Sequence, residues 1–176
     1  RVVEAKAVVR AAPAADRVLL ERPQASRRFA RVEDHDARAL DGIDVPSYAI
    51  DLPGHGASTD PLSDLYGDAG HVAAVLRGIG TPAVLVGHSY GGAVITEAAG
   101  RHPDIAHLVY LTAFALDEGE SIMSLLTSLP RAEVALGPAI MPNEDGTSVI
   151  DPAQAARAFY GECPPPAVTA AIARLS

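Results

Sequence analysis

The sequence predicts an α/β fold with a mostly parallel sheet and flanking helices, and three observations lead to this prediction. Short apolar runs alternate with helix-like runs from Val45 onwards. One apolar run, at 83–86, passes directly into a helical run through the tight sequence Gly-His-Ser-Tyr-Gly. After Leu111 helical segments follow without further apolar runs. Alternation of this kind favours parallel strands joined by right-handed crossovers, and the late helices predict a helical cap after the last strand.

Composition bounds the class of protein. The chain has 176 residues, of which 48% are hydrophobic and 20% charged, and a chain of this size buries about 70% of its unfolded surface. A formal net charge of −8 argues against a nucleic-acid partner. No apolar run approaches the roughly 18 residues of a membrane span. Cys163 has no second cysteine to pair with, so we expect a cytoplasmic protein.

Glycine and arginine divide the chain into three parts. Residues 1–41 contain none of the 15 glycines and are rich in Arg and Ala, so we expect a divergent head that is poorly ordered or partly helical. Within it, residues 1–15 show no clean period and are expected to be irregular or marginally helical, while residues 18–20 suggest a short strand. Residues 42–116 form the expected core, and residues 117–176 the expected cap.

The core has clear signals for strands, helices and their ends. Asp64 is a suitable N-cap for the first helix, and Gly78 and Gly80 are expected to stop it. The last strand, Ala106–Leu111, reads as a buried strand. In order, we expect a strand at 46–51, a loop at 52–58, a helix at 64–79, a strand at 82–86, a helix at 90–101 and a strand at 106–111.

The cap is predicted to consist of three helices separated by a loop and a proline break. Residues 120–130 have the pattern of a short amphipathic helix, and residues 137–147 read as a loop. Asp151 caps an expected helix at 152–160, and a run of three prolines separates it from a last helix near 167–175.

Ser89 is the candidate nucleophile because of its place between strand and helix. A serine forced into a strained turn projects its hydroxyl into open space. Its neighbours Gly87 and Gly91 must be small where strand and helix cross. The backbone N–H of Tyr90 then points from the helix N-terminus towards an oxygen that becomes negative. This pattern indicates nucleophilic catalysis with an oxyanion hole.

Other readings of the same stretch fit less well. An ordinary Gly/Ser turn is the main alternative, and a dinucleotide-binding loop would need glycine where Ser89 stands. His/Cys/Asp/Glu spacing typical of a metal site is lacking, so no metal is expected.

The residues then resemble a known family. The segments DLPGHGAS at 51–58, VLVGHSYGGAVITEAA at 84–99 and LVYLTAFALDEGES at 108–121 are similar to the α/β-hydrolase fold. Together with FYGECPPP at 159–166, they resemble small esterase-like members related to salicylate-ester and pyrethroid hydrolases. The resemblance covers residues 45–176. It implies a serine hydrolase that needs no cofactor and acts on a small-molecule ester through an acyl-serine intermediate.

The same resemblance shows what is unusual here. The family takes a second oxyanion donor from a His-Gly loop, and the corresponding place holds Glu21-Arg22-Pro23. It places the triad acid and histidine on later strands, so we expect an incomplete, truncated form of the fold. Asp117 follows the strand after Ser89 and is a possible acid, a solvated loop residue being the alternative.

Three functions stay open at this point. The first is ester hydrolysis by Ser89. The second is a catalytically incomplete fragment or a non-catalytic small-molecule binding module. The third is another chemistry on the same scaffold, such as cyanohydrin cleavage. An uncovered sheet edge at 106–111 also predicts self-association.

Overall fold

The computed structural model describes residues 6–11, 47–56, 58–130, 134–144 and 147–173, and these form two compact units. One unit comprises Ala5–Leu125, and the other comprises Leu126–Ser176 together with Arg1–Glu4. The division falls inside helix α4 (Ile122–Ser128). Most of the expected head, including the strand expected at 18–20, lies outside the described residues.

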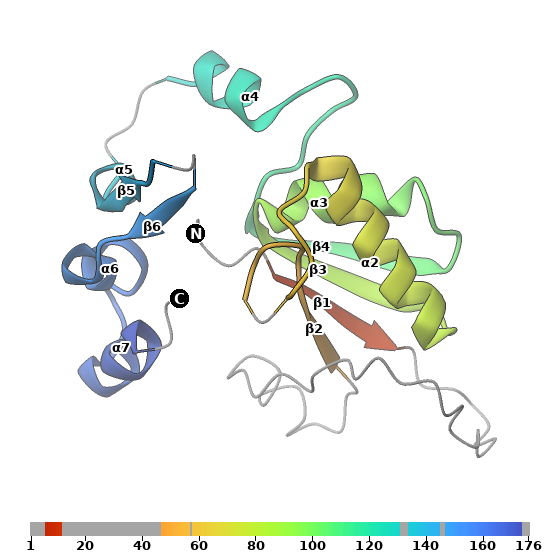
Figure 1. Cartoon of the computed structure of the whole chain (residues 1–176), viewed down its shortest axis with the longest axis horizontal. Helices are drawn as coiled ribbons and strands as arrows, with labels where there is room; N and C mark the ends of the chain where they lie inside the picture. Colours follow the sequence, from red (N-terminus) through yellow and green to blue (C-terminus); the bar gives the residue numbers. More distant parts are fainter. Residues whose placement is uncertain (1–5, 12–46, 57, 131–133, 145–146, 174–176) are drawn as a thin grey trace. The chain divides into compact units, whose positions relative to one another are not determined.

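A four-stranded sheet forms the centre of the larger unit (Figure 1). Its strands run in the order β2-β1-β3-β4, and β3 pairs with β4 in parallel, as the alternating pattern predicted. The strands are β1 (Lys6–Ala11), β2 (Ser47–Asp51), β3 (Ala83–Ser89) and β4 (Ile105–Ala113).

Strand β1 corrects the expectation that residues 1–15 are irregular or helical. It lies between β2 and β3 and pairs antiparallel with both, Val8 opposite Ala49 on one side and Val86 on the other. The sheet is therefore mixed, and β2 and β3 run in the same direction on either side of an antiparallel strand. A strand held between two partners takes its stability from distant residues, which a local pattern does not display.

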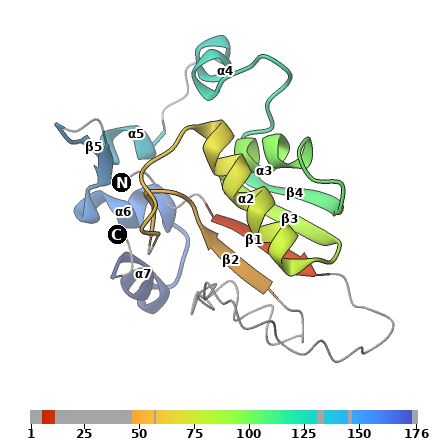
Figure 2. The same ribbon diagram turned by 45° about the vertical axis from the view of Figure 1, so that its right-hand side comes forward.

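Two helices cover one face of this sheet and form its core (Figures 1 and 2). Helix α2 (Leu65–Ile79) begins at Asp64, whose side chain accepts a 2.8 Å hydrogen bond from the Gly67 N–H. It ends at Gly80 in the left-handed conformation, which glycine adopts at little cost. Helix α3 (Gly91–Ala99) follows β3 directly. Both helices were expected close to these bounds.

The core joins both helices to the sheet in a single apolar cluster. Leu85 of β3 and Val94 and Ile95 of α3 are fully buried. Alternate residues of β3 are buried, as expected for a strand with one covered face. The cluster comprises Ile50, Leu52, Ala69, Val72, Val75, Leu76, Ala83, Leu85, Val94, Ile95 and Ala98.

Strand β4 is at the edge of the sheet, and its exposure corrects the expectation of a buried strand. Val109 and Leu111 are 43% and 56% exposed. Within the described part of the chain, β4 pairs with β3 alone. Its apolar side chains are typical of a buried strand, but most of them are exposed to solvent.

The smaller unit is not wholly helical. Helix α5 (Leu136–Ala139) leads into a hairpin of β5 (Ile140–Pro142) and β6 (Ser148–Ile150), where a loop was expected. Helix α6 (Pro152–Phe159) begins at its predicted N-cap Asp151, which accepts from the Ala153 N–H at 2.9 Å. Helix α7 (Pro165–Ile172) starts two residues earlier than expected. Three-residue strands are too short for a period of two to be visible in sequence.

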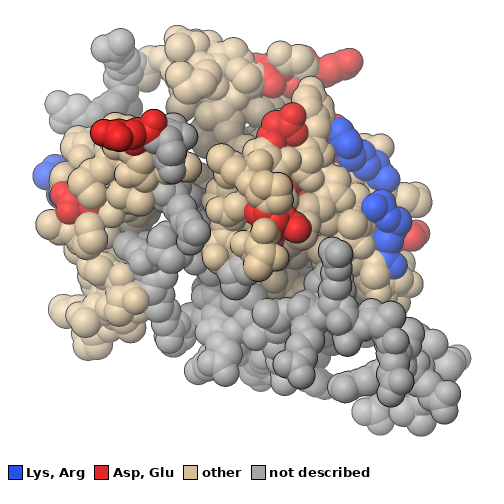
Figure 3. Space-filling model, in the orientation of Figure 1, with Lys and Arg blue, Asp and Glu red and all other residues tan. Residues whose placement is uncertain are grey.

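Basic side chains gather on one part of the visible surface. On the face shown in Figure 3, most of the visible Lys and Arg surface forms a strip over α2 and α3. Among the helices of the described residues, none is long and apolar enough to cross a bilayer.

Candidate active site

The turn from β3 to α3 holds Ser89 in a strained backbone conformation. Its φ of 53° lies in the left-handed region, which costs a non-glycine residue roughly 1–3 kcal/mol. Strand β3 ends at Ser89 and α3 begins at Gly91, so only Tyr90 separates the two elements. The described structure thus has a sharp strand-to-helix turn with a half-buried serine at its apex.

Close backbone contacts explain the glycines of this turn. A Cβ on Gly87 would lie 2.5 Å from the carbonyl oxygen of Gly91 and 2.8 Å from the Gly92 nitrogen. A Cβ on Gly92 would lie 2.8 Å from the Ala113 Cβ and closer still to the Phe114 carbonyl oxygen. Gly91 itself is buried. Side chains at Gly87 or Gly92 would push α3 away from the sheet.

A bulge in β4 accommodates the strained serine. His88 pairs with Leu111 and Ser89 with Ala113, so Thr112 is an extra residue without a partner on β3. Its φ of 44° is also left-handed. The Phe114 N–H then donates to the Ser89 carbonyl at 3.1 Å. Bulges often re-aim side chains next to functional sites.

Tyr90 occupies the N-cap position of α3 and makes no side-chain cap. Its carbonyl accepts from the Ala93 and Val94 N–H groups at 3.0 and 3.3 Å. The first N–H groups of a helix have no acceptor within the helix, and the helix dipole makes this end positive. This end of α3 therefore has backbone donors beside Ser89 that suit a developing negative charge.

The phenol of Tyr90 makes a contact that sequence reasoning missed. Its hydroxyl donates to Asp68 Oδ2 of helix α2 at 2.8 Å. Asp68 is 1% exposed, and burial raises the pKa of its carboxyl, a rise opposed by the Tyr90 hydrogen bond. Burial and the neighbouring Asp68 also raise the pKa of Tyr90. The available signal was an acidic residue on the apolar face of a helix, at 68 beside Ala69 and Val72.

The loop after β2 approaches the same region. Burial raises the pKa of the Asp68 carboxyl, and positive charge on His55 of this loop or on His71 of α2 would oppose that rise. His55 Nδ1 lies 2.9 Å from the Pro53 carbonyl oxygen, so Nδ1 carries the proton there. The Asp51 carboxylate lies where a Cβ on Gly56 would be, its Cγ 2.6 Å from that position.

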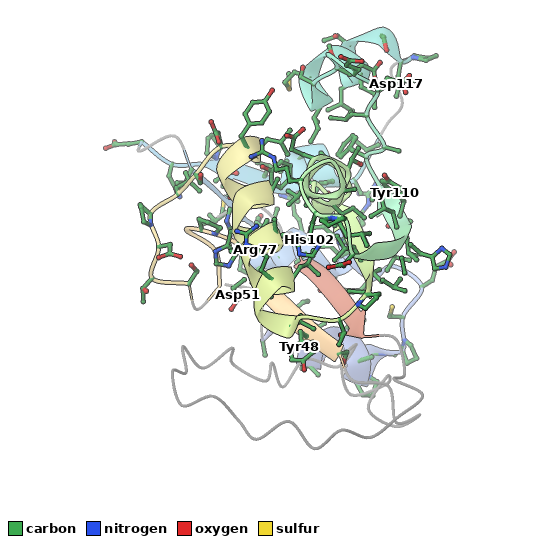
Figure 4. The ribbon with its side chains drawn as sticks, turned by 90° about the vertical axis from the view of Figure 1, so that its right-hand side faces the viewer. Tyr48, Asp51, Arg77, His102, Tyr110 and Asp117 are labelled. Carbon is green, nitrogen blue, oxygen red and sulfur yellow. The ribbon has the colours of Figure 1, made fainter. Side chains whose placement is uncertain are left out.

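No described side chain forms a hydrogen bond with the Ser89 hydroxyl, so the described residues place no base beside it. His71 lies 3.8 Å from Asp60, and His102 Nδ1 accepts from the Asp104 N–H. Asp117 is exposed, and in Figure 4 it lies well away from Asp51. Its N–H donates to Glu120 Oε2 at 2.9 Å in a turn. Its role as the acid stays a prediction.

The described residues do not form a metal site. They contain no group of three or more His, Cys, Asp or Glu side chains that could hold a metal ion.

Comparison with known proteins gives one family match and several relatives. The model of the family described as "Alpha/beta hydrolase family" matches residues 11–175. A protein of Nocardioides sp. strain SG-4G named "Carbendazim hydrolyzing esterase" is 53% identical over 53 residues, which are 30% of this chain and 22% of that protein.

A second relative comes from Neisseria meningitidis serogroup C and is named "Pimeloyl-[acyl-carrier protein] methyl ester esterase". It is 41% identical over 68 residues, or 39% of this chain and 26% of that protein. The matched stretches thus span about a quarter of each relative or less. No solved structure matches this chain.

Proposed function

This chain belongs to the alpha/beta hydrolase family, and we propose that it hydrolyses carboxylic esters with Ser89 as its nucleophile. The observation that carries this proposal is the left-handed φ of 53° at Ser89, at the end of β3 and immediately before α3. Strain of this kind persists only where the surroundings enforce it, and it clusters at functional sites. Membership of a hydrolase family supports a role for this strained serine as the nucleophile.

The reaction would proceed in two steps. The Ser89 Oγ attacks the ester carbonyl carbon, its proton passes to a base, and the carbonyl oxygen becomes an oxyanion. The Tyr90 N–H donates to that oxyanion, and loss of one such donor typically costs about 100- to 1,000-fold in kcat. Collapse breaks the bond to the alcohol oxygen, which takes the proton back from the base, and leaves an acyl-serine. Water then gives a proton to the base and attacks the acyl carbon, and the acid leaves as Ser89 Oγ regains its proton.

Small esters are the proposed substrate class. Both relatives are named as esterases, and one is named for a methyl ester. The relatives' matched segments are short. The acid and alcohol parts of the preferred ester should therefore be determined by assaying a panel of esters.

A binding module without hydrolysis is the second candidate. The lack of a hydrogen-bond partner for the Ser89 hydroxyl among the described side chains favours it, because an unassisted serine is a weak nucleophile. In such a protein the oxyanion donors would bind a carboxylate or carbonyl group without turning it over.

Labelling by a fluorophosphonate probe distinguishes the two candidates. We expect rapid covalent labelling of the wild-type chain and none of Ser89→Ala. The matched control is Ser124→Ala, which removes an exposed serine hydroxyl of α4 and should label like the wild type. Hydrolysis of p-nitrophenyl acetate and of a panel of methyl esters measures turnover. Labelling of the wild type at the rate of Ser89→Ala would contradict the hydrolase proposal and favour the binding module.

Location and self-association are further parts of the proposal. The free, exposed thiol of Cys163 supports a reducing compartment such as the cytoplasm. The exposed apolar residues of β4, Val109 and Leu111, support pairing of this edge with a second copy of the chain.

A further inference from the structure

Tyr90 serves two parts of the molecule at once. Its backbone begins α3 beside Ser89, while its phenol reaches Asp68 on α2, 22 residues earlier in the chain. Tyr90 therefore links the proposed oxyanion donor, its own backbone N–H, to helix α2.

Asp68 is an unusual residue for its position on α2. The other buried positions of this helix are Ala, Val and Leu. A buried carboxyl is unfavourable unless it is hydrogen-bonded, and Oδ1 of Asp68 has no partner in the described structure. Packing alone would favour an apolar residue here, so packing does not account for the carboxyl. The contact that it does make is the one with the Tyr90 hydroxyl.

The geometry gives that contact a mechanical effect. Ser89 is strained, and Tyr90 has no side-chain cap to fix the first turn of α3. A hydrogen bond from the phenol to a buried acceptor restrains the Tyr90 side chain, and through it the plane of the Ser89–Tyr90 peptide. That peptide carries the N–H proposed to meet the oxyanion.

We propose that Asp68 is a positioning residue, which holds the Tyr90 phenol so that the Tyr90 N–H points at the oxyanion. This inference rests on the proposed function, which gives the N–H its role. Asp68 acts through Tyr90 and does not touch the substrate. Because orientation matters most when charge develops, loss of this restraint should lower kcat and leave KM nearly unchanged.

Three variants test this restraint in the full chain. Tyr90→Phe removes the donor, and Asp68→Ala removes the acceptor. Asp68→Asn keeps an oxygen that accepts from the phenol and is the conservative rescue. Tyr66→Phe is the matched control, because it deletes a phenol hydroxyl from a tyrosine of α2 that is 60% exposed.

Kinetics with p-nitrophenyl acetate should separate these variants. We expect Tyr90→Phe and Asp68→Ala to lower kcat by about 10- to 100-fold, because small misplacements of catalytic groups have effects of this size. Asp68→Asn should stay within about threefold of the wild type, and Tyr66→Phe should be unchanged. Equal kcat in all four variants would overturn the inference. If a variant lost activity because it unfolded, its far-UV circular dichroism would change. Near wild-type kcat in Asp68→Asn would argue against such a general loss of fold.

Hydrogen exchange supplies a readout that does not depend on turnover. The amide groups of residues 88–92 should exchange faster in Tyr90→Phe and Asp68→Ala than in the wild type, and at the wild-type rate in Tyr66→Phe. Unchanged exchange would overturn the proposed restraint even if the enzyme is active. A wild-type chain that neither labels nor hydrolyses would instead overturn the proposed function, while faster exchange in Tyr90→Phe would still support the restraint on the turn.

Discussion

Replacing Gly87 with alanine is a severe test of the strand-to-helix turn. The added Cβ would lie 2.5 Å from the Gly91 carbonyl oxygen and 2.6 Å from its carbon. Ordinary close carbon-to-oxygen contacts are about 3.3 Å, so the start of α3 must move by roughly 0.8 Å. Both atoms that it meets belong to the backbone, and no flexible side chain can swing away instead.

The expected loss has a structural and a catalytic part. Overpacking of this kind costs about 1–3 kcal/mol of unfolding free energy, which corresponds to a fall in Tm of roughly 3–9 °C for a chain of this size. A displacement near 1 Å at a catalytic group reduces rates by about 100-fold. We therefore expect Gly87→Ala to be folded at 20 °C and to label with a fluorophosphonate probe about 100 times more slowly.

Gly70 of α2 provides a control for the effect of replacing any glycine with alanine. Gly70 lies in the interior of α2, and a Cβ there would meet no atom within 4 Å. Gly70→Ala should raise the unfolding free energy by about 0.5–1 kcal/mol, because alanine favours a helix. If the reasoning is correct, Gly87→Ala lowers and Gly70→Ala raises the Tm, while labelling slows in Gly87→Ala and stays at the wild-type rate in Gly70→Ala. Wild-type Tm and labelling in Gly87→Ala would refute the close approach of α3 to β3.

Asp68, strand β4 and the start of α2 can each be tested by one substitution. Burial raises the pKa of Asp68, so the folded chain binds this proton more tightly than the unfolded chain, and stability falls as pH rises from about 4 through the raised pKa. The unfolding free energy of Asp68→Asn lacks this dependence on pH. Urea unfolding across that range should therefore show the difference in unfolding free energy, variant minus wild type, growing with pH. A constant difference would contradict the prediction. Replacement of Leu111, 56% exposed on β4, by lysine should reduce self-association in sedimentation velocity, whereas a monomeric wild type would exclude edge pairing. Asp64→Ala removes the N-cap bond to Gly67 and should cost about 0.5–2 kcal/mol by thermal unfolding; an unchanged Tm would show that the cap contributes nothing.

Local signals predicted the elements that have local causes. Helices α2 and α6 were found through their N-caps Asp64 and Asp151, because a capping side chain acts within three residues. The turn at Ser89 was found because glycine is required close to it on both sides.

What the sequence did not reveal depends on residues that are far apart. Strand β1 pairs with residues about 40 and 75 positions away, and its Ala, Val and Arg residues carry no period that indicates a central strand. The hairpin of β5 and β6 is too short to show alternation. The Asp68–Tyr90 hydrogen bond joins residues on two different elements, so only the packing of α2 beside α3 displays it.

The division of the chain into two compact units has a consequence for how such a protein can diversify. Ser89, Tyr90, Gly87 and Asp68 all lie between Ala5 and Leu125, so the proposed chemical apparatus is carried by one unit. Insertions, deletions or exchange of the segment from Leu126 onwards would leave the strained turn and its restraint intact. Sequence variation confined to the segment from Leu126 onwards thus falls outside the unit that holds the strained turn, so the two parts of the chain can vary separately.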